Sequence, residues 1–118
     1  MSAADRVSAP NGSNTRSRSV TAGSVTTINL ATILGSTNYK FQDYWTLICT
    51  SSFYVLTAGV DDLSSGAVVI DETNHDDDGD EPMLWPANTP MPMDIQSKHE
   101  QYVGIKPTAN GVLRIKKG

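Results

Sequence analysis

The chain has 118 residues, of which 38% are hydrophobic and 19% are charged, and this size and composition predict one small domain with a single core. Its net charge of −4, without a run of Lys or Arg, argues against a nucleic-acid partner, because binding to phosphates needs clustered cations. The lone cysteine, Cys49, excludes an internal disulfide, and the apolar runs are too short to cross a membrane. Because the first residues lack the pattern of a secretory signal, we expect a soluble protein used without export.

Residues 1–19 are expected to form a flexible N-terminal arm, with residues 20–118 as the folded domain. Met1 and Val7 are the only larger apolar side chains in the arm, too few to offset the entropy of ordering it. The arm is mildly basic through Arg6, Arg16 and Arg18. It is either a terminus without a role or a segment that becomes ordered on a neighbouring subunit.

Several segments in the first two thirds of the domain show strand patterns. Alternate apolar and β-branched residues from Thr26 to Leu34 predict a half-buried strand. Trp45 to Cys49 and Phe53 to Ala58 are apolar runs that predict either a hairpin or one long bent strand. Ala67 to Ile70 predicts a further short buried strand.

The last third adds strands that differ in their proline content. Residues 82–93 contain four of the six prolines, which predicts an edge strand or an extended loop. Tyr102 to Lys106 and Leu113 to Ile115 alternate around Asn110-Gly111, which predicts a hairpin whose turn needs a positive φ. Asp94 to Tyr102 is the one candidate for a short helix. Short strands at regular intervals predict an all-β protein with a single β-sandwich or jelly-roll-like domain.

An acidic segment at residues 74–81 partly matches a calcium-binding loop. Asn74, Asp76 and Asp78 provide oxygen ligands at alternate positions, and Gly79 supplies the bend. The twelfth position is Trp85 instead of glutamate, so the match is incomplete. Two interpretations remain: a solvated acidic turn, or a weak calcium site that uses Asp76, Asp78 and Asp80.

The sequence contains no arrangement typical of catalysis. Cys49 lies among apolar residues, where a thiol is unreactive, and neither His75 nor His99 has a ligand partner at metal spacing. No phosphate-binding loop or nucleophile motif is present. We therefore expect a protein that is not an enzyme and that needs no cofactor.

Large apolar side chains in the proline-rich segment are candidates for an interface. Trp85, Met91 and Met93 are expected either to form an exposed contact patch or to lie as a lid over the core. A second alternative uses Tyr44 and Trp85, together with Tyr39, as an aromatic face for a carbohydrate or receptor.

The Ser-rich arm, the segment Thr89 to Met93 and the final strands Tyr102 to Lys106 and Gly111 to Ile115 resemble small virion accessory proteins of tailed bacteriophages. The resemblance implies a capsid decoration or cement protein, assembled as a homo-oligomeric dimer or trimer. Its partner would be the major capsid protein or another virion protein, and it would be located on the virion, which is assembled in the host cytoplasm. Arg16 and Arg18 would contact neighbouring coat subunits through the arm. The alternatives are a carbohydrate- or receptor-binding module and a calcium-stabilised adhesive domain.

Overall fold

The structure is a computed structural model that describes residues 15–33, 44–73, 81–94 and 101–117. These residues form eight strands and one short 3₁₀ helix, which is labelled η3 (Val60–Asp62). The strands are β1 (Thr15–Val20), β2 (Thr26–Asn29), β3 (Tyr44–Cys49), β4 (Phe53–Ala58), β5 (Met83–Trp85), β6 (Met91–Asp94), β7 (Tyr102–Pro107) and β8 (Gly111–Lys117).

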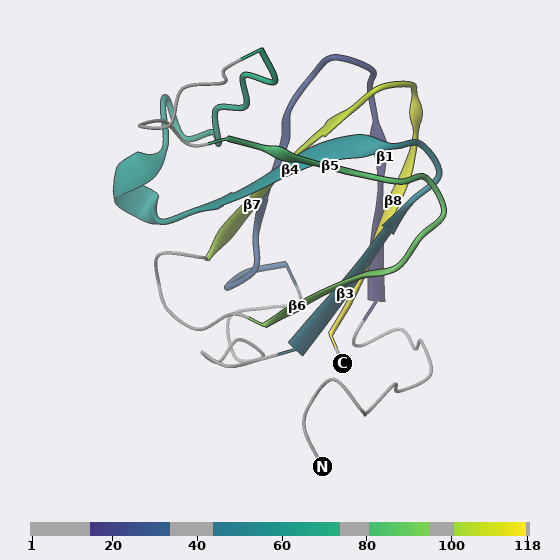
Figure 1. Cartoon of the computed structure of the whole chain (residues 1–118). Coiled ribbons are helices and arrows are strands. Elements are labelled where there is room, and N and C mark those ends of the chain that lie inside the picture. Colours follow the sequence, from purple (N-terminus) through teal and green to yellow (C-terminus); the bar gives the residue numbers. More distant parts are fainter. Residues whose placement is uncertain (1–14, 34–43, 74–80, 95–100, 118) are drawn as a thin grey trace.

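The strands form two four-stranded antiparallel sheets that pack as two layers (Figure 1). The first sheet has the order β1-β8-β3-β6 and the second sheet has the order β2-β7-β4-β5. Consecutive strands alternate between the sheets, except that β4 and β5 are neighbours in the second sheet. Eight strands exchanged between two sheets in this order form a jelly roll. The predicted all-β class and single β-sandwich are confirmed.

The core lies between the inner faces of the two sheets. In β3, Trp45, Leu47 and Cys49 are buried, and the residues between them are half-buried because successive side chains of a strand point to opposite faces. The same alternation on the other strands completes one hydrophobic cluster. Its most deeply buried members outside β3 are Ile28, Leu30, Phe53, Val103, Ile105, Leu113 and Ile115.

The predicted hairpin of Tyr102 to Lys106 with Leu113 to Ile115 is wrong. β7 belongs to the second sheet and β8 to the first, so the turn between them crosses the sandwich instead of joining paired strands. The runs that form β3 and β4, expected as either a hairpin or one long bent strand, are neither, because they are separate strands in facing sheets. Alternation along a strand shows which side chains point to the core, but it does not show to which of the two sheets the strand belongs. Gly111 has no positive φ either; a Cβ there would collide with the Thr50 side chain.

The predicted arm ends too late, because residues 15–19 belong to β1. All six residues of β1 pair with β8, from Thr15 opposite Lys116 to Val20 opposite Gly111. Only Val20 is buried, so the strand is held mainly by backbone hydrogen bonds, which a search for apolar side chains does not detect. The rest of the predicted arm, residues 1–14, lies outside the described residues.

Two other predicted strands are shorter than expected or absent. β2 ends at Asn29, where the carbonyl oxygen accepts hydrogen bonds from the backbone N–H of Thr32 and Ile33 and starts a turn. Val68 and Ile70 are buried as expected, but their segment forms no strand and makes only an isolated bridge between Ser64 and Ala67.

The proline-rich segment lies at sheet edges, as predicted. β5 is an edge strand of the second sheet and β6 is an edge strand of the first. Of the candidate helix, Asp94 ends β6 and Tyr102 begins β7, and the residues from 95 to 100 lie outside the described part.

The connection from β4 to β5 (residues 59–82), called the β4–β5 connection below, covers the outer face of the second sheet in its described part. Val68 and Ile70 form a second hydrophobic cluster with Ala58, against which Leu56 and Tyr102 of the sheet pack. The backbone N–H of Val68 donates to Thr27 Oγ1 over 3.0 Å, and Gly104 leaves room for the Val68 side chain. The second sheet is therefore covered on both faces.

Candidate interaction surface

The outer face of the first sheet has no second hydrophobic layer among the described residues. Tyr44, Ile48 and Val112 point to this face and belong to neither hydrophobic cluster. The antiparallel register places Arg114 beside Ile48 and Lys116 beside Thr46. Aromatic, aliphatic and cationic side chains are therefore presented together on a rigid sheet.

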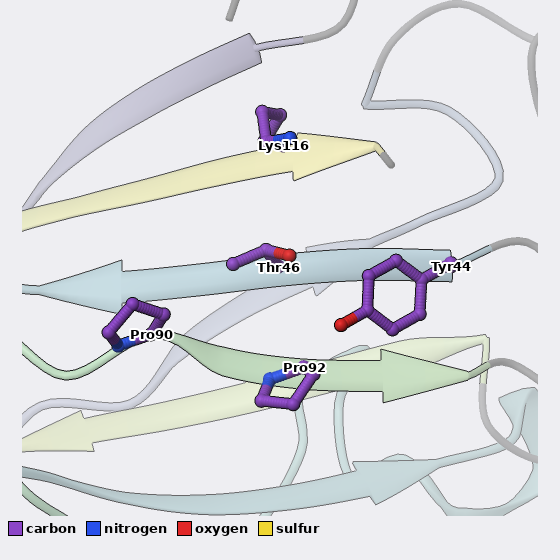
Figure 2. A pocket seen from close by; sticks show the side chains of 5 residues that line it. All are labelled: Tyr44, Thr46, Pro90, Pro92 and Lys116. Atoms are coloured by element: carbon purple, nitrogen blue, oxygen red, sulfur yellow. The ribbon is translucent and has the colours of Figure 1, made fainter. Parts of the chain in front are cut away.

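A shallow pocket of about 360 Å³ lies on this face, across three neighbouring strands (Figure 2). One row across the sheet consists of Lys116 on β8, Thr46 on β3 and Pro92 on β6. Tyr44 and Pro90 complete the lining. A phenol ring and two pyrrolidine rings give an apolar floor, while a hydroxyl and an ammonium group supply polar contacts. This combination suits a partner side chain or the apolar face of a sugar.

Of the two alternatives for Trp85, Met91 and Met93, the structure has the lid over the core and not the exposed contact patch. Met91 is 7% exposed and belongs to the main core, against which Trp85 and Met93 pack. The indole Nε1–H of Trp85 donates to the Thr89 carbonyl oxygen over 2.8 Å. Inward alternation on edge strands explains the burial, because the sheets close over one side of each residue. These three side chains cover the core.

Of the three aromatic residues named for the carbohydrate alternative, Tyr44 remains a candidate. Trp85 is half-buried, and Tyr39 lies outside the described residues.

Arg16 and Arg18, predicted as arm residues, lie on β1, which pairs with β8. The register places them on the side of Leu113 and Ile115, opposite to the side of Arg114 and Lys116. The two strands together hold five of the nine Lys and Arg residues and no Asp or Glu. We call this set the cationic ribbon; its members are Arg16, Arg18, Arg114, Lys116 and Lys117. Arg18 and Arg114 are exposed.

Sequence reasoning missed the cationic ribbon because its halves come from opposite ends of the chain. The absence of a nucleic-acid partner stays a prediction. Pairing the first strand with the last would have revealed the ribbon, since both Arg-containing segments alternate with a period of two.

The β4–β5 connection has the opposite charge. It contains nine of the thirteen Asp and Glu residues and no Lys or Arg. Asp61 and Asp62 are exposed in η3, and the Asp62 carboxylate accepts a hydrogen bond from the Gly59 N–H. Glu72 pairs with Lys106 over 2.6 Å, and the hydrogen bond from Lys106 is the main reason that the pKa of Glu72 lies below its ordinary value.

The other predicted chemical candidates divide between buried residues and residues outside the described part. Cys49 is buried and its Sγ lies 3.6 Å from Ser51 Oγ. The calcium candidates Asp76, Asp78 and Asp80 lie outside the described ranges, as do His75 and His99. Within those ranges, no group of three or more His, Cys, Asp or Glu side chains is placed to hold a metal ion.

Among the described residues there is no helix of the length and apolarity needed to cross a membrane. Comparison of the chain with protein families, characterised proteins and solved structures gives no match.

Proposed function

We propose that this chain is a structural virion protein that decorates or cements a phage capsid through protein–protein contacts. The observation that supports this most is the asymmetry of the jelly roll: among the described residues, one outer face is covered by the β4–β5 connection, and the other presents an aromatic pocket near Arg114. Jelly rolls of two four-stranded sheets recur in capsid and lectin domains. That recurrence is an analogy at the level of the fold. The specific argument comes from the outer face of the first sheet, which is called the open face below.

The open face has the composition of a protein interface. Tyrosine and arginine are enriched at binding hot spots, and Tyr44 and Arg114 are on this face. The two prolines beside Tyr44 add rigid apolar area that loses little conformational entropy on binding. A partner that covers the pocket would exclude water from the tyrosine ring. The partner in this proposal is the major capsid protein or another protein of the shell.

Cosedimentation with purified capsids that lack the protein tests this proposal. Full-length chain should pellet with the shells, and Tyr44→Ala should weaken binding by at least about tenfold if Tyr44 is a hot spot. Val69→Ala is the matched control, because Val69 is 59% exposed on the β4–β5 connection, away from the open face. Wild-type chain that stays in the supernatant at all shell concentrations contradicts the proposal.

The role of the arm needs a truncation that leaves β1 intact. A chain that starts at Thr15 keeps all six residues that pair with β8. If the arm contacts the shell, this truncation should bind more weakly while its melting temperature stays unchanged. Deletion of residues 1–20 is a poor test, because it removes an edge strand and exposes the β8 backbone.

A carbohydrate- or receptor-binding module is the second candidate, and the pocket is the observation that favours it. The Tyr44 ring, beside Pro90 and Pro92, offers an apolar surface on which a sugar face could stack. A glycan array compares the two functions directly. Binding of one glycan class by wild type, lost in Tyr44→Ala, would favour the module over the shell component.

A further inference from the structure

The four edge strands of the sandwich differ in what they offer to a further strand. β1 and β6 are the edge strands of the first sheet, and β2 and β5 are those of the second. In an antiparallel sheet, the backbone groups of successive residues point alternately to the strand on one side and to the strand on the other. Every second residue of an edge strand therefore directs its N–H and C=O away from the sheet, and we call these residues lateral positions.

A hydrogen bond at the end of one ladder identifies the lateral positions of β1. The Thr50 N–H donates to the Val112 carbonyl oxygen over 3.1 Å, and these two residues continue the register of β3 with β8. Val112 therefore faces β3, and the residue after it, which lies opposite Arg18, faces β1. Alternation along β1 then gives its lateral positions as Thr15, Ser17 and Ser19.

Prolines surround the lateral positions of β5 and β6. By the same alternation, Leu84 is lateral in β5 and Pro92 is lateral in β6. The positions two residues away along the chain include three further prolines, which are Pro82, Pro86 and Pro90. Because proline has no N–H, this side of the sandwich offers few donors to an incoming strand.

Of the two remaining edge strands, β1 is the better suited to pairing. β2 has four residues, and the carbonyl oxygen of its lateral residue Asn29 accepts the hydrogen bonds of the following turn. β1 has six residues and no proline, and Ser17 and Ser19 are exposed. Within the described residues, no strand lies beyond β1. The Thr15 carbonyl oxygen accepts a bond from Arg16 Nη1 over 2.8 Å, so the argument uses the two serines.

Arg18 determines which strands β1 can accept. It points to the core side of the sheet, as does Leu113 opposite it, yet it is exposed because β1 is at the edge. A residue of an added strand opposite Arg18 would form a non-hydrogen-bonded pair with it, in which the two Cα atoms are about 4.5 Å apart. Opposite charges stabilise such a pair and like charges destabilise it, so an acidic residue is favoured there.

The same charge disfavours a second copy of β1 as the added strand. An antiparallel pairing of Ser17 with Ser17 would place Arg18 opposite Arg16 of the second copy. A pairing of Ser17 with Ser19 would place Arg18 opposite Arg18. Both registers bring like charges together on one face, which points to a different partner.

We propose that the outer edge of β1 binds an extended segment of a shell protein as an added strand, with an acidic side chain of that segment opposite Arg18. The proposal rests on the proposed function for the source of the segment. Main-chain bonds with Ser17 and Ser19 supply affinity, and the residue opposite Arg18 supplies specificity. The added strand extends the first sheet, to which the open face belongs.

Cosedimentation with shells tests the role of the backbone edge. Ser17→Pro removes a lateral N–H and leaves the bonds between β1 and β8 in place, so it should weaken binding by up to about tenfold. Leu84→Pro is the matched control, because it makes the same change at the lateral position of β5. It should bind like wild type. Circular dichroism checks that both variants are folded.

Charge variants test the same edge without altering the backbone. Arg18→Glu should weaken binding by at least about tenfold, because an acidic residue of the added strand would then meet a like charge. Arg18→Lys keeps the positive charge and should bind like wild type. This pair keeps the proposal testable if Ser17→Pro does not fold.

A peptide titration tests strand addition without shells. The probes are the end-blocked peptides Thr-Glu-Thr-Glu-Thr and Thr-Lys-Thr-Lys-Thr at millimolar concentration, added to the full-length ¹⁵N-labelled chain. The amide signals of Ser17 and Ser19 should shift with the acidic peptide and much less with the basic one. Signals of Leu84 should not move with either peptide.

The proposal is overturned if folded Ser17→Pro and Arg18→Glu pellet like wild type, or if Leu84→Pro weakens binding as much as Ser17→Pro. It is also overturned if the acidic peptide leaves the serine amides unchanged. Shell binding by wild type and by both β1 variants would leave the proposed function intact. Wild type that does not pellet but binds the acidic peptide at β1 would refute the shell as the source of the segment, while strand addition would stand.

Discussion

The two outer faces of the sandwich differ in what lies over them. On the second sheet, Val68 and Ile70 from the β4–β5 connection form a hydrophobic layer over Leu56 and Tyr102. On the first sheet, the corresponding outward positions hold tyrosine, threonine, isoleucine and cations that belong to no hydrophobic cluster of the described residues. Within the described ranges, a connection and not a strand accounts for the difference between the two outer faces.

The largest expected effect comes from a matched pair of isoleucines, one on each face. Ile70→Ala removes a side chain that is 5% exposed in the covered layer and should destabilise the fold by about 3 kcal/mol. Ile48→Ala acts on the half-buried open face, where less contact is lost, and should cost less than about 1 kcal/mol. Urea denaturation of both variants measures the difference. Equal losses would mean that the first sheet is covered as well as the second.

Overpacking the covered face should have the next largest effect. A Cβ on Gly104 would lie 2.6 Å from both Cβ and Cγ1 of Val68, so Gly104→Ala must displace the β4–β5 connection. We expect a loss of about 2 kcal/mol, measured by the same denaturation experiment. In a Val68→Gly background the same change should cost much less, since the obstructing atoms are gone. An undiminished loss there would show that backbone conformation, not Val68, requires glycine.

The contrast between the faces also marks the limit of what the sequence could predict. The all-β class and the strand character of Trp45 to Cys49 were predicted correctly, and the proline-rich segment takes the edge position that was one of its two alternatives, because each follows from a local pattern. The alternation of buried and half-buried residues in β3 was not predicted, since that run was expected to be apolar on both faces. The sequence did not predict which strand belongs to which sheet, since a strand buried on one face shows the same alternation in either sheet. Burial of Val68 and Ile70 was predicted, but their packing outside the sandwich was not.

The candidate site was less predictable than the fold, because it depends on strand neighbours. Trp85 and Met91 were chosen for their size in a proline-rich segment, yet alternation turns both towards the core. The pocket combines β3, β6 and β8, and the ribbon combines the first and last strands. No short segment of the sequence contains all the residues of the pocket or all those of the ribbon. Tyr44 was the one open-face residue that sequence reasoning had selected, and only as part of an alternative function.

A smaller effect is expected from the hydrogen bond that ties the connection to the covered face. Thr27→Val keeps the side-chain shape but removes the Oγ1 acceptor of the Val68 N–H. The loss should be about 1 kcal/mol, the usual net contribution of one hydrogen bond. Hydrogen exchange measures it locally: the Val68 amide should exchange faster, while amides of β3 should keep their protection. Unchanged exchange at Val68 would mean that other contacts fix the connection.

The smallest expected effect is the pH dependence of the ion pair that anchors the end of the covered layer. Because the hydrogen bond from Lys106 lowers the pKa of Glu72 in the folded state, the pair stabilises the fold above the ordinary glutamate pKa. That contribution is lost as the pH falls through the lowered folded-state pKa. Between about pH 7 and about pH 3, the melting temperature of Glu72→Gln should therefore decline less steeply than that of wild type.

The size of this difference will be modest, since the pair lies at the surface and is screened by salt. Repeating the titration at high ionic strength should bring the two curves closer together. Arg114→Gln on the open face is the control, because Arg114 is exposed, and its curve should follow wild type over the same acidic range. If Glu72→Gln also follows wild type, the ion pair adds nothing to the anchoring. The hydrophobic contacts of Val68 and Ile70 with the second sheet would then be sufficient to explain why that face is covered.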